Sequence, residues 1–584
     1  MNLKKFFSEL KRREVYKVAI AYGITAWLIA QISGLVSASF EFPSWVMQMI
    51  ITILIIGFPI VLVLSWVFEV SSKGIVKTTP LVSDDSDKNK SMEIRLVIGI
   101  LVLISILMVG GWWTWQKFGF DKRPPIRSLV VLPFDNFTGS DEYEYFVAGI
   151  HSSLIQDISK IGKLKVKSKT TANSYKETDM SVPEIASELG IDAAVEGSIT
   201  CMGEDSVCVQ IRLISAYNEE QQIWVQDYEV AKDQILNFYN DVTKKISQEI
   251  NVVLTPQEEN LLAEVKPVDP GAYDAYLKGR YYWDDLSLES LNKAREYLEN
   301  AVEIAPDWAA PYAGLAQVWV GLAQMGLESP EIAGPKIMEN LEKAIELDPN
   351  FPDSHYINGI IAVWTEWNWE KGEKEFLHAL AINPSDAMSR IFYAHLLISL
   401  QRQDEAMSQA QRAVELDPMN PLLLGLYAVV AINGGAWEDA RTHINKSLSL
   451  DPDGFFTNNI LKFLAFHDKD IEKILQTLRI CWQMEESILQ KINIISEKEG
   501  FDVAYAEAIQ QVGLMNGSPI DIAVGYMITN QPEKALESLE TGFKMHDSNI
   551  PYITTHLFNF EPLYGNPRFI DIVEKMNLPL DANQ

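Results

Sequence analysis

The sequence is poor in cysteine, in histidine and in positive charge. Its 584 residues include 3 cysteines and 8 histidines, and 79 acidic residues outnumber 49 lysines and arginines, which gives a formal net charge of −30. Three cysteines cannot build a disulfide framework or a four-cysteine zinc site. Contacts between cations and phosphates supply most of the affinity of nucleic-acid binding proteins. We therefore exclude a disulfide-rich scaffold and expect no nucleic-acid partner.

The sequence also lacks the local motifs of catalysis. Its histidines are scattered, none lies in an HExxH pair, and the phosphate-binding loops GxxxxGKS/T and GxGxxG do not occur. The segment GIHSS around His151 is not a nucleophile elbow, because no glycine stands two residues after a serine. We predict no catalytic residue, no metal ligand and no cofactor, and hence a protein that is not an enzyme.

Three long apolar runs occupy the first fifth of the chain. They cover residues 18–40, 45–68 and 96–115, and each is near the ~20 residues that cross a bilayer as a helix. Tryptophans stand at their ends, as aromatic side chains do at membrane interfaces. A cleaved signal peptide fits less well, because the second run follows the first after a very short turn. We predict a membrane anchor over residues 1–120 that lies in the lipid bilayer.

The lysines and arginines around these runs predict an orientation. Six precede the first run, none lies in the turn SASFEFPS, and the next loop holds Lys73, Lys77, Lys88, Lys90 and Arg95. The positive-inside rule then places the N-terminus in the cytoplasm and the chain from about residue 120 on the opposite side. The basic residues that follow the third run oppose this topology. Small residues recur at spacings of three and four in the first run, which favours close packing within the hairpin or in a homo-oligomer.

The middle of the chain alternates between strand and helix patterns. Short apolar runs suited to strands are SLVVLPF, LKVKS, AAVEGSI, VCVQIRLIS and QQIWVQDYE. An amphipathic helix with Phe146, Ile150, Leu154 and Ile158 on one face follows the first strand, and a second amphipathic helix closes the region. This pattern predicts an α/β domain with a mixed sheet over residues 127–254.

This region resembles a known family of bacterial envelope domains. The segments LVVLPFDNFTGSDEYEYFVAGI and VPEIASELGIDAAVEGSI look like the TolB-amino-terminal-like, FlgO-like domain. The resemblance implies a non-catalytic module beside a membrane anchor, and so a bacterial inner-membrane protein with residues from about 120 onward in the periplasm. Members often have Asp where this sequence has Ala148. Relatives often carry a cytoplasmic cyclase or winged-helix domain, for which we expect no room before the first run.

Two of the cysteines lie close together in a proposed hairpin. Cys201 shares its strand parity with Ile199, and Cys208 lies out of phase with the apolar residues Val207 and Val209. If both apolar sets face one core, the two cysteines point to opposite faces, unless a bulge shifts the register. The sequence therefore leaves open whether they are bonded, although a periplasmic location would permit it.

After a linker over residues 255–271 the chain becomes periodic. Prolines end similar phrases at Pro306, Pro349, Pro384, Pro418 and Pro452, with spacings of 43, 35, 34 and 34. Small residues recur five and twelve positions before these prolines and ten positions after the first four. A period of 34 resembles the tetratricopeptide repeat, a helix–turn–helix unit. We predict repeats over 272–452 and degenerate repeats with a cap over 453–584. The predicted fold is multi-domain, with three transmembrane helices, an α/β mixed-sheet domain and an all-α tetratricopeptide solenoid.

Stacked repeats present a concave face lined by the first helix of each pair. The register of the family places Tyr276, Trp283, Gln317, Tyr356, Ile360 and His395 on that face. Aromatic residues are enriched at binding hot spots, although some of these side chains can equally pack between repeats. We expect a membrane-tethered, envelope-facing scaffold that binds a protein or peptide in this groove. The alternative is a transmembrane signalling sensor that lacks an output domain of its own.

Overall fold

The computed structural model describes residues 15–39, single positions between 50 and 65, residues 68–71 and 74–77, and residues 125–580 with gaps at 218–220, 264, 284–286, 325–326 and 516. The chain forms two compact units, Met1–Lys122 and Arg123–Gln584. Most of the predicted run 45–68 and all of the predicted run 96–115 lie outside the described residues.

Among the described residues of the first unit, one helix is long and apolar enough to cross a membrane. Helix α2 (Val15–Ser39) contains a qualifying window over Val15–Ser33, and no other described helix meets the same test. Its large apolar side chains are exposed, with Ile20 at 60% and Trp27 at 63%. A membrane anchor and a signal sequence share these properties. The Tyr22 hydroxyl donates to the carbonyl of Leu54 (2.7 Å), so the chain returns along α2. A two-stranded hairpin follows, formed by β1 (Phe68–Ser71) and β2 (Gly74–Lys77).

The second unit begins with the mixed sheet that the sequence predicts. Its strands are β3 (Ser128–Val131), β4 (Asp135–Asn136), β5 (Lys165–Val166), β6 (Ala193–Met202), β7 (Ser206–Ser215) and β8 (Gln221–Ala231). The order is β5-β3-β6-β7-β8, with β4 also paired to β6. β3 is parallel to β5 and β6, and the β6–β7 and β7–β8 pairs are antiparallel. Four helices accompany the sheet: α5 (Glu144–Ile158), α6 (Lys169–Asn173), α7 (Val182–Leu189) and α8 (Ile235–Glu249).

The LPF and VEGS motifs lie against each other in the core of the domain, and this contact explains the phenylalanine of the first and the glycine of the second. Phe134 ends the LPF motif, in the connection between β3 and β4, and Gly197 lies in the VEGS segment of β6. A Cβ atom at Gly197 would lie 2.3 Å from the Phe134 ring, so glycine leaves the space that the ring fills. The helix α5 lies on the same core, with Phe146, Ile150, Leu154 and Ile158 all buried.

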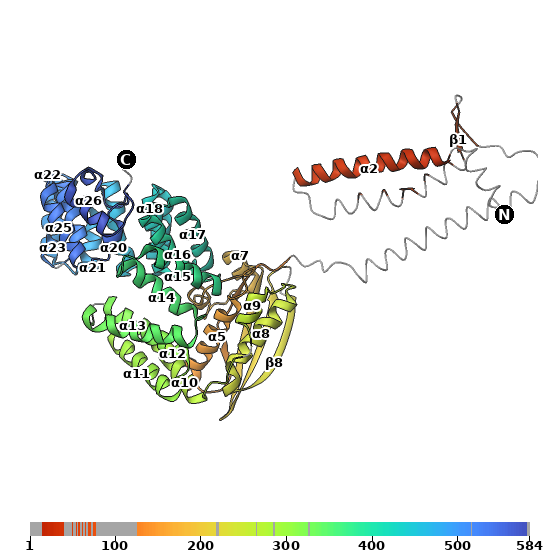
Figure 1. The fold of residues 1–584 in the computed structure, drawn as a ribbon, viewed down its shortest axis with the longest axis horizontal. Coiled ribbons are helices and arrows are strands. Elements are labelled where there is room, and N and C mark those ends of the chain that lie inside the picture. The colour runs from red at the N-terminus through yellow and green to blue at the C-terminus, as the bar shows by residue number, and fades with distance from the viewer. Residues whose placement is uncertain are drawn as a thin grey trace, which may run out of the picture. The chain divides into compact units, whose positions relative to one another are not determined.

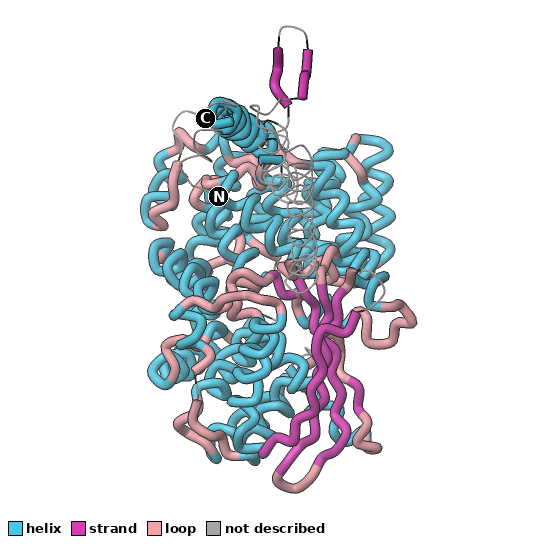
Figure 2. Tube along the Cα trace, turned by 90° about the vertical axis from the view of Figure 1, so that its right-hand side faces the viewer, coloured by secondary structure: helices cyan, strands magenta, loops and turns pink. Residues whose placement is uncertain are grey.

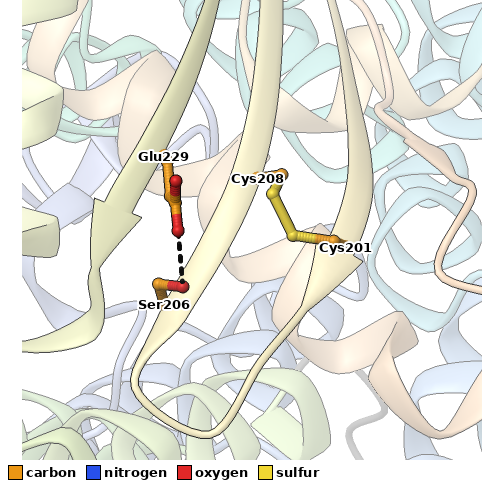
Figure 3. The surroundings of a disulfide bond; sticks show 4 residues. All are labelled: Cys201, Ser206, Cys208 and Glu229. Carbon is orange, nitrogen blue, oxygen red and sulfur yellow. Dashed lines mark hydrogen bonds between the residues drawn. A yellow bond between two sulfur atoms is a disulfide. The ribbon is translucent and has the colours of Figure 1, made fainter.

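A β-bulge in the hairpin decides the cysteine question. The register of β6 and β7 shifts between Ile199 and Cys201, which places Cys201 directly opposite Cys208 with 4.9 Å between their Cα atoms. The two residues form a disulfide (Figure 3). The expectation of opposite faces in an unbroken register is therefore wrong, because the extra residue Thr200 turns Cys201 to the other face.

Helical hairpins make up the rest of the second unit (Figure 1). After α9 (Pro256–Leu261) the paired helices are α10 (Pro270–Trp283) with α11 (Leu288–Ile304), α12 (Ala309–Gln324) with α13 (Pro330–Leu347), α14 (Pro352–Trp364) with α15 (Trp369–Ile382), α16 (Ala387–Ser399) with α17 (Gln403–Leu416) and α18 (Pro421–Asn433) with α19 (Trp437–Leu450). The small residues predicted five positions before each proline are all buried. At Gly359 a Cβ would lie 2.8 Å from the Phe376 ring.

Further helix pairs continue the stack beyond the regular repeats. They are α20 (Phe455–Asp468) with α21 (Ile471–Trp482), α22 (Glu486–Glu499) with α23 (Phe501–Leu514) and α24 (Pro519–Ile528) with α25 (Pro532–Lys544), before α26 (Pro567–Lys575). A buried ion pair joins Lys462 to Asp521 at 2.7 Å. The segment 550–578 is rich in buried aromatic side chains, which belong to the same apolar core as α16 and α18.

The α/β domain packs against turns of the repeats far along the chain. Asp417, which is 2% exposed, accepts hydrogen bonds from the hydroxyls of Ser168 and Thr171, the latter at 2.8 Å. Ser385 donates to the carbonyl of Leu164 at 3.2 Å. These contacts join residues about 220 to 250 positions apart. The sheet and the repeats therefore form one body (Figure 2).

Candidate functional site

The first helices of the repeats lie next to one another, as the predicted groove requires. α10, α12, α14, α16 and α18 contact each other in that order. A ladder of hydrogen bonds connects the first three of these helices, α10, α12 and α14. Arg280 donates to Gln317 (3.3 Å) and to Asp353 (3.2 Å), and the Gln317 amide donates to the same Asp353 carboxylate (3.3 Å). Each helix thus contributes one member, and Gln317 is the middle one.

The ladder provides a polar surface with both charges present. The Arg280 side chain is 31% exposed and that of Asp353 is 22% exposed. The guanidinium of Arg280 presents its donors in a fixed fork, which suits contact with two neighbouring helices at once. The partly exposed Arg280 and Asp353 side chains place a cation and a carboxylate side by side on this surface.

A small cavity lies where the α/β domain meets the first repeat. Its volume is about 30 Å³. The lining comes from α5, α6 and α10, and includes Ala148, Ser152, Lys169, Tyr276 and Arg280. Ala148 contributes no carboxylate to this wall. A cavity of this size has room for a water molecule. Neither a cofactor nor a metal is expected there, and no cluster of metal-ligating side chains occurs among the described residues.

Two of the predicted groove residues contribute strongly to packing. Tyr276 is 8% exposed and its ring centroid lies 4.9 Å from that of Trp308. Trp283 lies against α12, where a Cβ at Gly321 would be 2.9 Å from the indole. Both aromatic rings therefore fix the spacing of the first two repeats, and replacing either one would disturb that spacing.

Tyr356 and Ile360 occupy the third repeat and are half-buried. The Tyr356 ring lies 5.8 Å from that of Phe392 on the next first helix. Ile360 packs against the apolar core that also contains α16. Part of each side chain stays accessible, so both remain candidates for contact with a partner.

His395, the last predicted groove residue, is covered by the chain itself. It is 2% exposed and lies between the Leu426 carbonyl (3.0 Å from Nε2) and the Tyr552 hydroxyl (3.0 Å from Nδ1). A carbonyl only accepts, so Nε2 carries the proton and Nδ1 accepts from Tyr552. Burial lowers the pKa of His395 to about 4, which keeps the ring neutral.

The segment 550–578 makes several such contacts. The Trp369 indole donates to the carbonyl of Met576 (2.7 Å), Gln401 donates to the carbonyl of Thr554 (3.2 Å), and the backbone N–H of His556 donates to Asn433 (3.0 Å). This segment thus contacts the third, fourth and fifth helix pairs. The accessible side chains of the groove are those on α10, α12 and α14, where the ladder lies next to the half-buried Tyr356 and Ile360.

Sequence reasoning missed Arg280, Asp353 and Tyr552. Arg280 lies four residues after Tyr276 on the same helix, so a search of that helical face for charged residues would have found it. Asp353 lies in the first turn of its helix and reads as a residue favoured at a helix N-terminus. No local signal points to Tyr552, because its partner lies 157 positions away.

A family model and several known proteins match parts of this chain. Residues 389–420, which cover most of α16, all of α17 and the turn after it, match the tetratricopeptide repeat. A Rhizobium meliloti protein named as an adenylate cyclase is 26% identical over 43% of this chain and 45% of its own length. The Salmonella typhimurium transcriptional regulator HilA is 23% identical over 51% of this chain and 52% of its own length. The chain thus spans about half the length of these curated relatives.

Among solved structures, the Pseudomonas aeruginosa protein pilF is similar in part. It has 18% sequence identity, covers 38% of this chain and 97% of that chain, and has a TM-score of 0.29.

Proposed function

We propose that this protein is a membrane-tethered, envelope-facing scaffold that binds a protein or peptide through the first helices of its tetratricopeptide repeats. The observation that carries the proposal is the ladder of Arg280, Gln317 and Asp353 on three adjacent first helices. Tyr356 and Ile360 supply apolar surface next to it. The polar ladder would orient the backbone of a bound peptide, and the aromatic ring would supply contact area.

Two features of the described residues support an envelope location. Helix α2 exposes large apolar side chains along its length, which is favourable in lipid. The Cys201–Cys208 disulfide suits an oxidising compartment such as the periplasm. The predicted spans 45–68 and 96–115 would complete the anchor, with the N-terminus in the cytoplasm.

Tethering gives the mechanism a physical basis. A scaffold held at the membrane raises the effective concentration of whatever it binds near that surface. The net charge of −30 keeps the body soluble and repels other acidic surfaces. The attraction for a partner must therefore come from the local chemistry of the ladder.

Site-specific photocrosslinking in living cells tests the groove. A photoreactive residue replaces Gln317 in the full chain, and a matched one replaces Lys343, which lies on the second helix α13 with its side chain 40% exposed. We expect specific adducts at position 317 that Tyr356→Ala reduces and that position 343 does not form. Identical adducts at the two positions would show that the groove assignment is wrong.

A reporter that is active only in the cytoplasm, fused after Gln584, tests the topology. We expect no activity from it. Activity would refute the envelope-facing orientation and leave the groove test unaffected.

The signalling sensor remains a second candidate, because the curated relatives bear the names of a cyclase and a transcriptional regulator. In that case a ligand on the body would change crosslinking along α2. Cysteine crosslinking at Gly23, with and without an occupied groove, distinguishes the two functions, since a pure scaffold predicts no change.

A further inference from the structure

Strand β8 is the outermost strand of the sheet and is paired on one side only. It forms hydrogen bonds with β7, and no other described strand pairs with it. Figure 1 shows β8 at the outer edge of the α/β domain. An edge of this kind presents a row of backbone N–H and C=O groups that another strand can pair with.

The edge carries few of the devices that usually prevent strand pairing. Natural edge strands are short, or contain proline or lysine, or are covered. β8 is 11 residues long and contains neither proline nor lysine, and its charged residues are Asp227 and Glu229. A bulge disturbs its register at Ile223, but Trp224–Ala231 pair with β7 without interruption. Val225 is 41% exposed. A regular, accessible stretch of backbone is therefore available.

The sequence of β8 is complementary to itself in one register. When all of β8 pairs antiparallel with a second copy, Gln226 faces Gln226 and Trp224 faces Tyr228 of the second copy. Asp227 then faces Val225, and no like charges lie opposite each other. Moving the centre to Asp227 would bring two carboxylates together, which is unfavourable. Moving it to Val225 would leave the end of the strand unpaired.

The aromatic residues of this register already lie together within one strand. The Trp224 and Tyr228 rings are 6.4 Å apart in an edge-to-face arrangement, and Tyr228 lies 5.1 Å from Phe238 of α8. Both rings are only half-buried. Two copies would bring four such rings to the centre of the joint sheet and cover them. Aromatic cross-strand pairs are among the more stabilising pairs in sheets.

We propose that the chain forms a homodimer by antiparallel pairing of β8 with β8 of a second copy, with Gln226 on the two-fold axis. A second copy is a better partner than a foreign strand, because β8 has a register in which its residues complement those of another β8. Pairing with a foreign strand would not require such a register. An isologous contact also closes the assembly at two copies. Each copy is strongly acidic, so the dimer forms more readily as salt screens the repulsion.

Cysteine crosslinking of the full chain in its membranes tests the register. The background carries Cys481→Ser, which removes the cysteine outside the disulfide. Gln226→Cys places two thiols opposite each other, and we expect a mild oxidant to convert most of the chain to a linked dimer. The matched variant Gln222→Cys is on the same strand and also exposed. In this register the two copies of residue 222 lie roughly 27 Å apart, so no link forms.

Charge substitutions test the same contact by affinity. Gln226→Lys puts two cations opposite each other and should weaken dimerisation of the solubilised full chain at least tenfold, whereas Gln222→Lys should change it less than twofold. Equal effects of the two lysines, equal linking of the two cysteines, or a chain that stays monomeric at all concentrations would overturn the proposal. Linking of Gln226→Cys to another protein would also overturn it, because the edge would then bind a foreign strand.

Discussion

Acidification should release the segment 550–578 from the repeats, because it protonates a buried histidine. His395 accepts a hydrogen bond from Tyr552 at Nδ1 while its Nε2 donates to Leu426. A proton added at Nδ1 removes that acceptor and places a charge where the side chain is 2% exposed. We therefore expect His395 to resist protonation as long as the segment 550–578 covers it.

The size of the effect follows from the pKa. Burial lowers the pKa of His395 to about 4 from 6.5. The folded state then binds fewer protons than the unfolded state, so stability is lost as the pH falls from 6.5 towards 4. The full difference corresponds to about 3 kcal/mol, of which about 2 kcal/mol is already lost between pH 7 and pH 5. Burial also lowers the pKa of His151 to about 4, so a similar loss comes from the α/β domain.

Urea unfolding at pH 7 and pH 5, followed by tryptophan fluorescence, measures this loss. Trp369 donates to Met576 and therefore reports on the segment. In His395→Gln the amide can donate to Leu426 and accept from Tyr552 without titrating. We expect this variant to lose about 2 kcal/mol less than the wild type between the two pH values. His467→Gln, which replaces a histidine with 42% of its side chain exposed, is the matched substitution. If His395→Gln lost as much stability as the wild type, the reasoning would be refuted.

Three further predictions concern the packing of the α/β domain. Cys208→Ser removes the disulfide and should lower the unfolding free energy of the domain by about 2.5 kcal/mol. A reductant should cause the same loss in the wild type and no further loss in the variant. Gly197→Ala forces a methyl group into the Phe134 ring and should cost about 1–3 kcal/mol in thermal unfolding. Combining it with Phe134→Leu should recover part of that loss, and no recovery would contradict the packing argument. Asp417→Asn replaces the charged acceptor of two hydroxyl donors and should speed hydrogen exchange at residues 165–172, whereas Asp404→Asn on an exposed surface should not.

The repeats and the sheet could be predicted because their signals are periodic. The proline spacing and the small residues marked the five helix pairs from α10 to α19, and Phe376 against Gly359 shows the close packing that the small residues permit. Alternation predicted the strands of the sheet, and the residues expected on its helix α5 are buried. A match to the tetratricopeptide repeat at residues 389–420 agrees with that periodicity.

The rest depended on contacts that leave no periodic trace. One extra residue, Thr200, turns Cys201 to the other face of the sheet. The alternation of apolar and polar residues does not show where such a bulge lies. Asp417 reads in the sequence as one more helix-ending Asp-Pro, yet it binds two hydroxyls of the α/β domain. The covering of His395 by Tyr552 likewise joins residues 157 positions apart.

The covering of the repeats by residues 550–578 has a consequence for the order of folding. These residues pack onto helices that lie 123 to 207 positions earlier in the chain. During synthesis or export, α16 and α18 emerge well before the segment that covers them. Their apolar faces stay exposed to solvent until that segment has emerged. Such long delays between partners slow folding and expose the chain to aggregation. A nascent chain of this kind would depend on a holding chaperone until its last helices arrive.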